Sequence, residues 1–242
     1  MKKTSFFPLL FSALSFSLLF SSCQETEIGS SKDVNQQAIY FEYDVSADEE
    51  SGMAVVRLRY RFGGPHGTTL LLAGPSEVSF NGKTLQPDSS KYNGVYYEAA
   101  VPVAELAGEQ VIRFTDTESK MYENSFQFSP VYIADSLPAM VRQGKDLVIQ
   151  LGGLSPRDYI SFILTDTAFG SREIHRTDTL QDGRLVIFSD ELTRLQPGPL
   201  SLEIYREERK RLENTTPEGG VLVKTYALRR EITLAADSLK AD

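Results

Sequence analysis

Alternation of apolar and charged side chains is the feature that most constrains the fold of this chain. In the segment VVRLRYRF, residues 55–62, apolar side chains alternate with Arg57, Arg59 and Arg61. A period of two is typical of a β-strand with one face in a core and the other in water. The segment therefore predicts a sheet that is covered on one side. The arginine stripe is either a solvated strand face or a binding face, and we expect the former.

Short apolar runs separated by turn residues fill the chain from Ala38 onward, and no segment shows a long helical period. Asn81-Gly82 lies between two such runs, and this dipeptide is the strongest short signal for a β-hairpin. Residues 189–198 carry one helical turn. The last strand candidate exceeds the usual strand length, so a bulge near residues 226–228 is expected. The candidates are 38–45, 55–62, 68–73, 78–85, 94–101, 110–115, 124–133, 145–151, 158–165, 183–189, 198–207 and 219–234.

The strand candidates form two groups of about a hundred residues, which predicts an all-β chain with two domains. The chain has no Trp and one Cys, so both cores depend on Phe, Tyr, Leu, Ile and Val. This organisation resembles tandem immunoglobulin-like β-sandwich domains, and Tyr205 resembles the tyrosine at the corner before their strand F. The resemblance implies sandwich domains at residues 38–134 and 135–236 and a tail at 237–242.

The N-terminus begins with Lys2 and Lys3 and continues with an apolar run over residues 6–20. That run is too short for a transmembrane helix and is typical of the apolar core of a secretory signal peptide. Ser21 and Ser22 then precede Cys23, the only cysteine.

The segment Leu19-Phe20-Ser21-Ser22-Cys23 resembles the lipobox of bacterial lipoproteins, although Phe20 stands where that family usually has Leu. The resemblance implies a signal peptide at residues 1–22 and acylation of Cys23 with lipids such as palmitate. Residues 23–37 would be the lipidated N-terminus and a flexible tether. The alternative is a plain signal peptide with an incidental cysteine.

The residues after Cys23, Gln24-Glu25-Thr26-Glu27, are similar to the surface-export signal of Bacteroidota lipoproteins. This similarity implies an outer-membrane lipoprotein at the cell surface, with the periplasmic face of the same membrane as the alternative. Cleavage would remove Lys2 and Lys3 from 25 basic residues and none of the 33 acidic ones, so the formal charge would change from −8 to −10. A protein of this charge is repelled by nucleic acid and by anionic lipid headgroups, so we expect no nucleic-acid partner. We expect the lipid anchor alone to attach the protein to the membrane.

Residues that could carry catalysis or hold a metal are sparse. The two histidines, His66 and His175, lie in different predicted domains, and neither has the neighbouring ligands of a zinc site. The acidic run at 48–50 lacks the spacing of a calcium loop and is expected to be a solvated turn. No nucleophile, nucleotide-binding or metalloprotease motif occurs. We therefore expect no enzyme, no cofactor and no metal.

Two further sequence features are candidate sites. The segment REERKRLENTTPEGG, residues 206–220, is predicted to be a loop, either a solvated hairpin end or a recognition loop that presents Arg206, Arg209, Lys210 and Arg211. Asp-Ser/Thr-apolar triplets are similar to the O-glycosylation acceptor of exported Bacteroidota proteins. Among them Thr167 and Thr179 are expected in loops and are the candidate glycosylation sites. The alternative is that these triplets occur only because Asp-Ser and Asp-Thr favour turns.

These features favour a lipid-anchored protein that acts as a protein–protein interaction or scaffolding module in the cell envelope. The alternative is a glycan-binding accessory lipoprotein of an outer-membrane nutrient-uptake system. Glycan platforms rely on exposed aromatics, and Tyr92, Tyr96 and Tyr97 are the candidates. Tyr96 and Tyr97 point to opposite faces of one strand, so at most one of them can face solvent.

Replacing Cys23 tests the lipid anchor. We expect Cys23→Ala to abolish acyl labelling and to shift the protein from the membrane fraction to soluble or unprocessed forms, because the thiol is the predicted acceptor of the lipid. Metabolic labelling with an alkyne fatty acid and fractionation measure both effects. Membrane retention of an unlabelled Cys23→Ala protein would contradict the prediction.

Overall fold

The structure, a computed structural model, describes residues 27–155, 158–168, 170–180 and 182–237. No helix among these residues is long and apolar enough to cross a membrane. The elements in chain order are β1 (Ile28–Ser30), η1 (Ser31–Asp33), η2 (Gln36–Ala38), β2 (Ile39–Asp48), β3 (Met53–Phe62), β4 (Thr68–Leu71), β5 (Glu77–Phe80), β6 (Lys83–Thr84), β7 (Pro87–Ser90), β8 (Gly94–Pro102), η3 (Val103–Leu106), β9 (Glu109–Thr115), β10 (Met121–Gln127), β11 (Tyr132–Ile133), β12 (Met140–Arg142), β13 (Leu147–Gly152), β14 (Tyr159–Asp166), β15 (Glu173–Thr179), β16 (Arg184–Ile187), α1 (Ser189–Leu192), β17 (Gly198–Arg211) and β18 (Gly220–Ala235).

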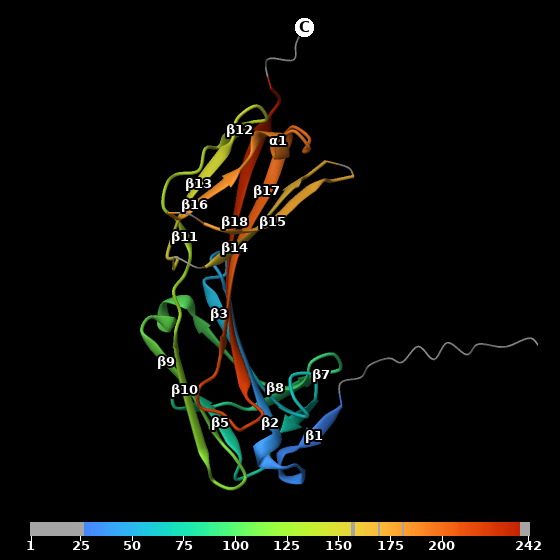
Figure 1. The fold of residues 1–242 in the computed structure, drawn as a ribbon, viewed down its shortest axis with the longest axis vertical. Helices are drawn as coiled ribbons and strands as arrows, with labels where there is room; N and C mark the ends of the chain where they lie inside the picture. The colour runs from blue at the N-terminus through green and yellow to red at the C-terminus, as the bar shows by residue number, and fades with distance from the viewer. Residues whose placement is uncertain (1–26, 156–157, 169, 181, 238–242) are drawn as a thin grey trace, which may run out of the picture.

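One large sheet runs the length of the molecule in the order β1-β4-β3-β2-β18-β17-β14-β15, with β8 attached at β3, β7 at β8 and β12 at β18. Two small sheets, β10-β9-β5-β6 and β11-β13-β16, pack on the same side of it, one near each end (Figure 1). Each small sheet closes a sandwich, which we call the lower lobe (β1–β10) and the upper lobe (β11–β16). The predicted all-β class and tandem sandwich arrangement are confirmed.

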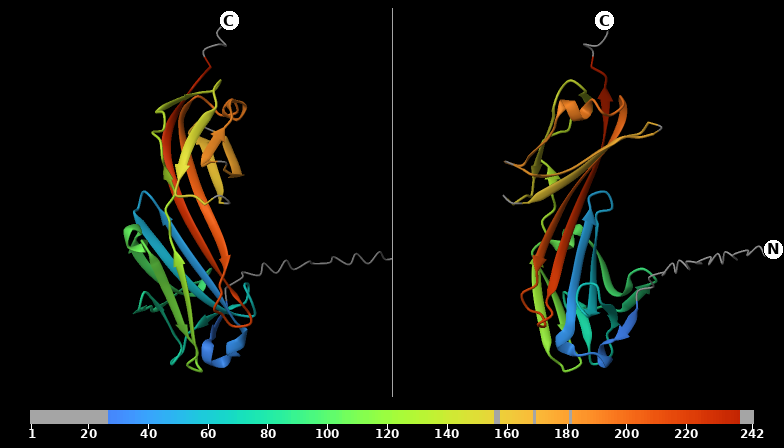
Figure 2. Two further views of the ribbon diagram at one scale, coloured as in Figure 1. Left: turned by 60° about the vertical axis from the view of Figure 1, so that its left-hand side comes forward. Right: turned by 45° about the vertical axis from the view of Figure 1, so that its right-hand side comes forward.

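The β17–β18 hairpin belongs to both lobes, as Figure 2 shows from two further sides. Its register is unbroken from Gly198↔Leu234 to Arg211↔Val221. In the upper lobe β14 pairs with residues 200–206 of β17, and in the lower lobe β2 pairs in parallel with residues 220–227 of β18. Part of the segment 135–236 therefore completes the sheet of the first sandwich. The expected bulge near residues 226–228 is absent, so that prediction was wrong.

Local sequence explains several elements directly. Strand β3 contains the alternating segment, and its side chains Val56, Leu58 and Tyr60 are fully buried. Between β5 and β6, Asn81 and Gly82 adopt positive φ angles of 48° and 78°, the conformation that a two-residue hairpin turn requires. The predicted Asn-Gly hairpin is confirmed.

Aromatic side chains form the centre of the lower core. Phe41 makes edge-to-face contacts with Tyr60, Phe114 and Tyr122 at centroid distances of 5.1–5.3 Å. Such pairs contribute about 0.5–1.5 kcal/mol each beyond the burial of their area. The hydroxyls of Tyr43 and Tyr60 lie 3.3 Å apart, and burial raises the pKa of both phenols. These rings supply the packing that a disulfide and a core Trp supply in other sandwiches.

Residues 28–37, part of the predicted flexible tether, form ordered structure on the lower lobe. Strand β1 pairs in parallel with β4, and Ser31 behind it is fully buried. The Gln36 side chain donates to the carbonyls of Ser31 at 2.6 Å and Val34 at 2.9 Å. The Ser31 hydroxyl oxygen accepts from the Ala73 N–H at 2.9 Å, and the Gln36 side-chain carbonyl accepts from the Thr117 N–H at 3.4 Å, so these bonds fix the segment to the lower lobe. The tether prediction was therefore wrong from Ile28 onward.

Candidate functional site

The face of the large sheet opposite the two small sheets, which we call the open face, carries the arginine stripe of β3. Arg59 and Arg61 both pair with Glu42 of β2, at 2.7 and 2.6 Å, and Arg57 pairs with Glu98 of β8 at 2.7 Å. Each of the three cations is thus ion-paired with a carboxylate on a neighbouring strand. As expected, the stripe is an ordinary strand face with cross-strand pairs, which stabilise a sheet modestly.

Asp44 lies on the open face between these arginines. Burial raises the pKa of its carboxyl group, although Arg59 and Arg57 oppose the increase. Desolvation therefore exceeds the attraction of the arginines, which are already engaged by Glu42 and Glu98.

The end of the β17–β18 hairpin differs from this ion-paired stripe. Arg209 and Arg211, two residues apart on β17, are exposed and have no ion-pair partner within the described residues. They border a groove of about 620 Å³ on the open face. Tyr40 of β2 and Glu218 of the hairpin turn also line it, with Pro217, Gly219, Gly220 and Val221. The groove combines two guanidinium groups with one phenol and one carboxylate.

Contacts with β10 and β2 hold the hairpin end in place. The side-chain amide of Asn124 donates to the Asn214 carbonyl at 2.8 Å and accepts from the Asn214 N–H at 3.1 Å. The hydroxyl of Thr216, which is buried, donates to the Ile39 carbonyl at 2.7 Å. Residues 206–220 are therefore no solvated loop: β17 continues to Arg211, and the turn packs on the lower lobe.

A smaller hollow of about 260 Å³ lies on the other side of β17, between the hairpin end and β10. Lys210 borders it and pairs with Glu213 at 3.0 Å. Leu212 and Leu222 supply an apolar part of its wall, and Glu123, Asn124, Ser125, Arg211 and Asn214 complete it.

Arg206 was predicted to lie in an exposed recognition loop, and that prediction is wrong. It is only 3% exposed and lies where the two lobes meet. Its guanidinium donates to the carbonyls of Ser129 and Gly153, the latter at 2.8 Å, and pairs with Asp158 at 3.3 Å. Arg206 thus links the segment between the lobes to the upper lobe and is unavailable to a partner. Arg209, Lys210 and Arg211 remain predicted recognition residues.

The other predicted sites lie apart from this hairpin end. Cys23 and the predicted signal peptide lie outside the described residues. Thr167 follows β14 and is exposed, whereas Thr179 is the last residue of β15 rather than a loop residue. His66 is exposed in the turn between β3 and β4, and His175 contacts the Tyr205 hydroxyl at 3.1 Å. In a tyrosine corner the hydroxyl bonds to backbone a few residues upstream, whereas the Tyr205 hydroxyl contacts the side chain of His175 on β15. The expected tyrosine corner is therefore corrected. Within the described chain no three His, Cys, Asp or Glu side chains group as metal ligands.

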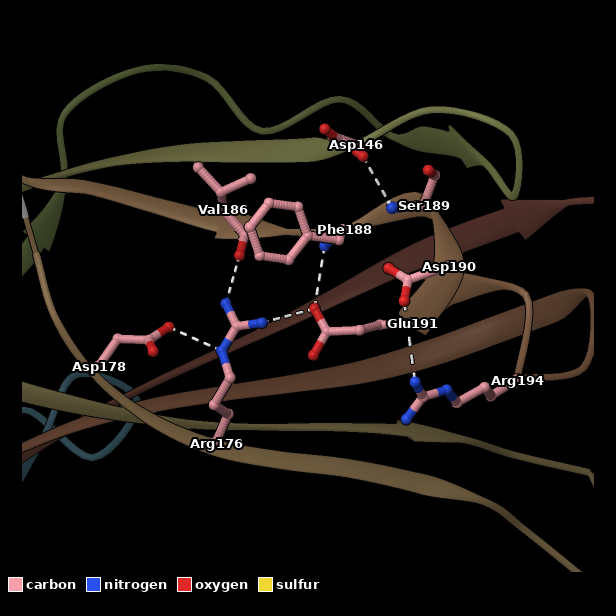
Figure 3. A network of polar contacts seen from close by, with 9 residues as sticks. All are labelled: Asp146, Arg176, Asp178, Val186, Phe188, Ser189, Asp190, Glu191 and Arg194. Atoms are coloured by element: carbon pink, nitrogen blue, oxygen red, sulfur yellow. Dashed lines mark hydrogen bonds and ion pairs between the residues drawn. The ribbon is translucent and has the colours of Figure 1, made fainter.

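A second polar cluster, in the upper lobe, is fully engaged within the protein (Figure 3). Arg176 of β15 pairs with Asp178 at 2.7 Å and Glu191 at 2.6 Å, and it donates to the Val186 carbonyl. Glu191 also accepts from the Phe188 N–H at 3.0 Å, at the start of α1. The predicted helical turn is thus present and is attached to β15. Sequence reasoning missed Arg176 because no motif marks it, and its contacts with Val186 and Glu191 arise only when β15, β16 and α1 pack together.

No family model matches the chain. No curated protein matches it. Among solved structures it is similar to DIP-gamma IG1+IG2, with 11% identity over 81% of this chain and 94% of that one and a TM-score of 0.23. The Bacteroides ovatus glucan-utilisation protein SGBP-B, solved with a mixed-linkage heptasaccharide, matches with 11% identity over 76% and 53% of the two chains and a TM-score of 0.24. Murine CEACAM1b matches with 13% identity over 82% of this chain and 100% of that chain and a TM-score of 0.21. Scores at this level transfer no function.

Replacing Arg206 tests its role between the lobes. We expect Arg206→Met to lower the free energy of unfolding by on the order of 3 kcal/mol, because it leaves Asp158 and two carbonyls without their cationic donor. Arg209→Met, on the same strand but exposed, is the matched control and should change stability by less than about 0.5 kcal/mol. Urea unfolding of both variants measures the difference, and equal stabilities would refute the assignment.

Proposed function

We propose that this protein is a lipid-anchored protein of the cell envelope that binds a protein partner through the end of its β17–β18 hairpin. The single observation that carries the proposal is the pair Arg209 and Arg211. They are exposed beside a groove, without partners within the described chain, whereas the three arginines of β3 on the same face are ion-paired. Arginine is enriched at binding hot spots because its planar fork forms several directed hydrogen bonds.

The rigidity of the hairpin end supports this proposal. Asn124 and Thr216 fix the turn through hydrogen bonds, and the ladder with β18 holds Arg209 and Arg211. A binding surface on an ordered strand loses less conformational entropy on association than a mobile loop. The backbone that carries the two arginines is thus fixed before the partner arrives.

The proposed anchor would also fix where this surface lies. The lower lobe begins at Ile28, and the five-residue step from Cys23 to Ile28 spans at most about 17 Å. A lipid on Cys23 would therefore hold the lower lobe close to the bilayer. The partner in this proposal is a protein of the same membrane or one that reaches its surface.

The distribution of aromatic side chains favours a protein partner over a glycan. Tyr92, Tyr132 and Tyr159 are the most exposed tyrosines, and they lie on separate elements. Every ring–ring contact in the described chain joins buried rings, such as Phe41 with Tyr60. Tyr96, the candidate that faces outward, is covered by Arg57 at 5.0 Å and donates to Asp88. The exposed rings therefore form no stacking platform for a sugar.

Photo-crosslinking in the native host tests the proposal. A photoreactive phenylalanine at position 217 or 218, which are exposed and line the groove beside the two arginines, should capture a specific membrane or envelope protein. The same residue at Lys83, exposed on β6 of the lower lobe, is the control and should not capture it. Mass spectrometry identifies the products. Identical capture from position 83, or no protein product together with specific binding on a glycan array, would contradict the protein-binding role.

A further inference from the structure

The lower part of β17 has a strand on one side only. Residues 200–206 pair with both β18 and β14, whereas in the described structure residues 207–211 pair with β18 alone. We call the unpaired side of residues 207–211 the open edge. The upper lobe fills this position with β14, and the lower lobe leaves it without a strand.

The hydrogen-bond phase shows which backbone groups face the open edge. The Leu212 N–H donates to the Gly220 carbonyl at 3.1 Å, so even-numbered residues of β17 bond to β18. Pro199, an odd-numbered residue, accepts from the Thr167 N–H on the β14 side. Because an antiparallel strand alternates between its two neighbours, the N–H and C=O groups of Glu207, Arg209 and Arg211 point to the open edge. These groups are a template for a further strand.

Two hollows flank the end of β17, and the larger one extends from Arg209 and Arg211 over β18 to Tyr40 of β2, away from the open edge. The 620 Å³ groove lies on the open face beside Arg209 and Arg211, and the 260 Å³ hollow lies on the opposite face beside Lys210 and Leu212. The side chains of an added strand alternate between the two faces of the sheet. Backbone bonds at an edge, together with contacts to alternate side chains, are the arrangement used in strand-addition recognition of peptides.

Charge specifies what such a strand should carry. Within the described residues Arg209 and Arg211 are exposed without ion partners, whereas Glu208 is already paired with Lys224 at 2.7 Å. Charged side chains at an edge oppose pairing with neutral or like-charged strands, which protects against aggregation. Opposite charges directly across a strand pair stabilise it. The same arginines that deter unspecific pairing therefore select acidic residues at alternate positions of a partner strand.

We propose that the open edge of β17 binds an extended acidic segment of a partner protein as an added β-strand. Its acidic side chains face Arg209 and Arg211, and its backbone pairs with residues 207, 209 and 211. This inference rests on the proposed protein-binding function and names the chemistry of the partner. It predicts contacts at the edge, whereas the crosslinking experiment asks only whether a protein is bound at the hairpin end.

Synthetic peptides test the proposal with the full-length mature chain in detergent. The probe is a fluorescein-labelled, capped octapeptide of alternating Glu and Val, and the comparison is the matching Lys-Val peptide. We expect the acidic peptide to bind at least tenfold more tightly by fluorescence anisotropy. R209E/R211E should reverse this preference, whereas K83E/K91E, the same charge change at exposed sites elsewhere in the lower lobe, should retain it.

Two further measurements separate strand addition from unspecific charge attraction. N-methyl groups on alternate amides of the Glu-Val peptide can be placed in two ways, or phases, each of which blocks the N–H groups on one side of the extended peptide. One phase should bind at least tenfold more weakly than the other, because one side of the backbone must pair with the edge. Arg209→Pro removes an N–H that faces the edge but no bond to β18, and it should weaken binding of the acidic peptide more than Arg209→Ala does. Unfolding curves verify that the variants are folded.

The outcomes separate this inference from the proposed function. No preference for the acidic peptide, or equal binding of both N-methylated phases, overturns strand addition even where crosslinking captures a partner. If crosslinking fails but the acidic peptide binds and R209E/R211E reverses its preference, the proposed function in cells is overturned. Binding of an acidic strand at the open edge is then still supported.

Discussion

The unbroken ladder between β17 and β18 is the interaction on which the rest of the structure depends. Its upper part pairs with β14 and its lower part with β2, so one pair of strands lies in the sheets of both sandwiches. Because every side chain on a strand alternates in direction, an unbroken register keeps one face of the sheet buried through both lobes. The bulge that such a long strand usually needs would reverse this alternation.

The point where the hairpin passes between lobes is also the point where it becomes available to a partner. Arg206 is the last residue of β17 that pairs with β14, and its side chain is buried between the lobes. From residue 207 onward the same strand is an edge. Arg206 points to the core side of the sheet and is buried, whereas Arg209 and Arg211 both lie on the open face beyond the start of β14 at Tyr159 and are exposed. A structural element and a candidate binding element are continuous in sequence.

Local patterns in the sequence predicted much of the fold. The alternation in residues 55–62 and the Asn81-Gly82 turn depend on neighbouring residues alone, and both are present in β3 and the β5–β6 hairpin. The charged run at 206–211 was misread as a loop because neither its pairing with residues 221–226 of β18 nor the contact of Arg206 with Asp158 shows in the local sequence pattern. The polar segment around Gln36 was misread for the same reason. Burial of polar side chains by distant backbone leaves no local signal.

Part of the candidate site was also visible in the sequence. Arg209, Lys210 and Arg211 were singled out as a basic group, but the groove, the hollow and the open edge arise from the pairing of strands and from the packing of the turn on β10. Residue types alone could not show which of the basic side chains is buried. Long-range pairing separates Arg206 from Arg209 and Arg211.

Residue-resolved amide hydrogen exchange tests the central claim most directly, because it reports on the ladder and the edge of one strand at the same time. The account predicts alternating protection at the end of β17: slow exchange at Glu208, Lys210 and Leu212, which bond to β18, and fast exchange at Glu207, Arg209 and Arg211. Uniform protection along residues 207–212 would show that the edge is already paired. Uniformly fast exchange would show that the hairpin end is a loop, and either result would contradict the account.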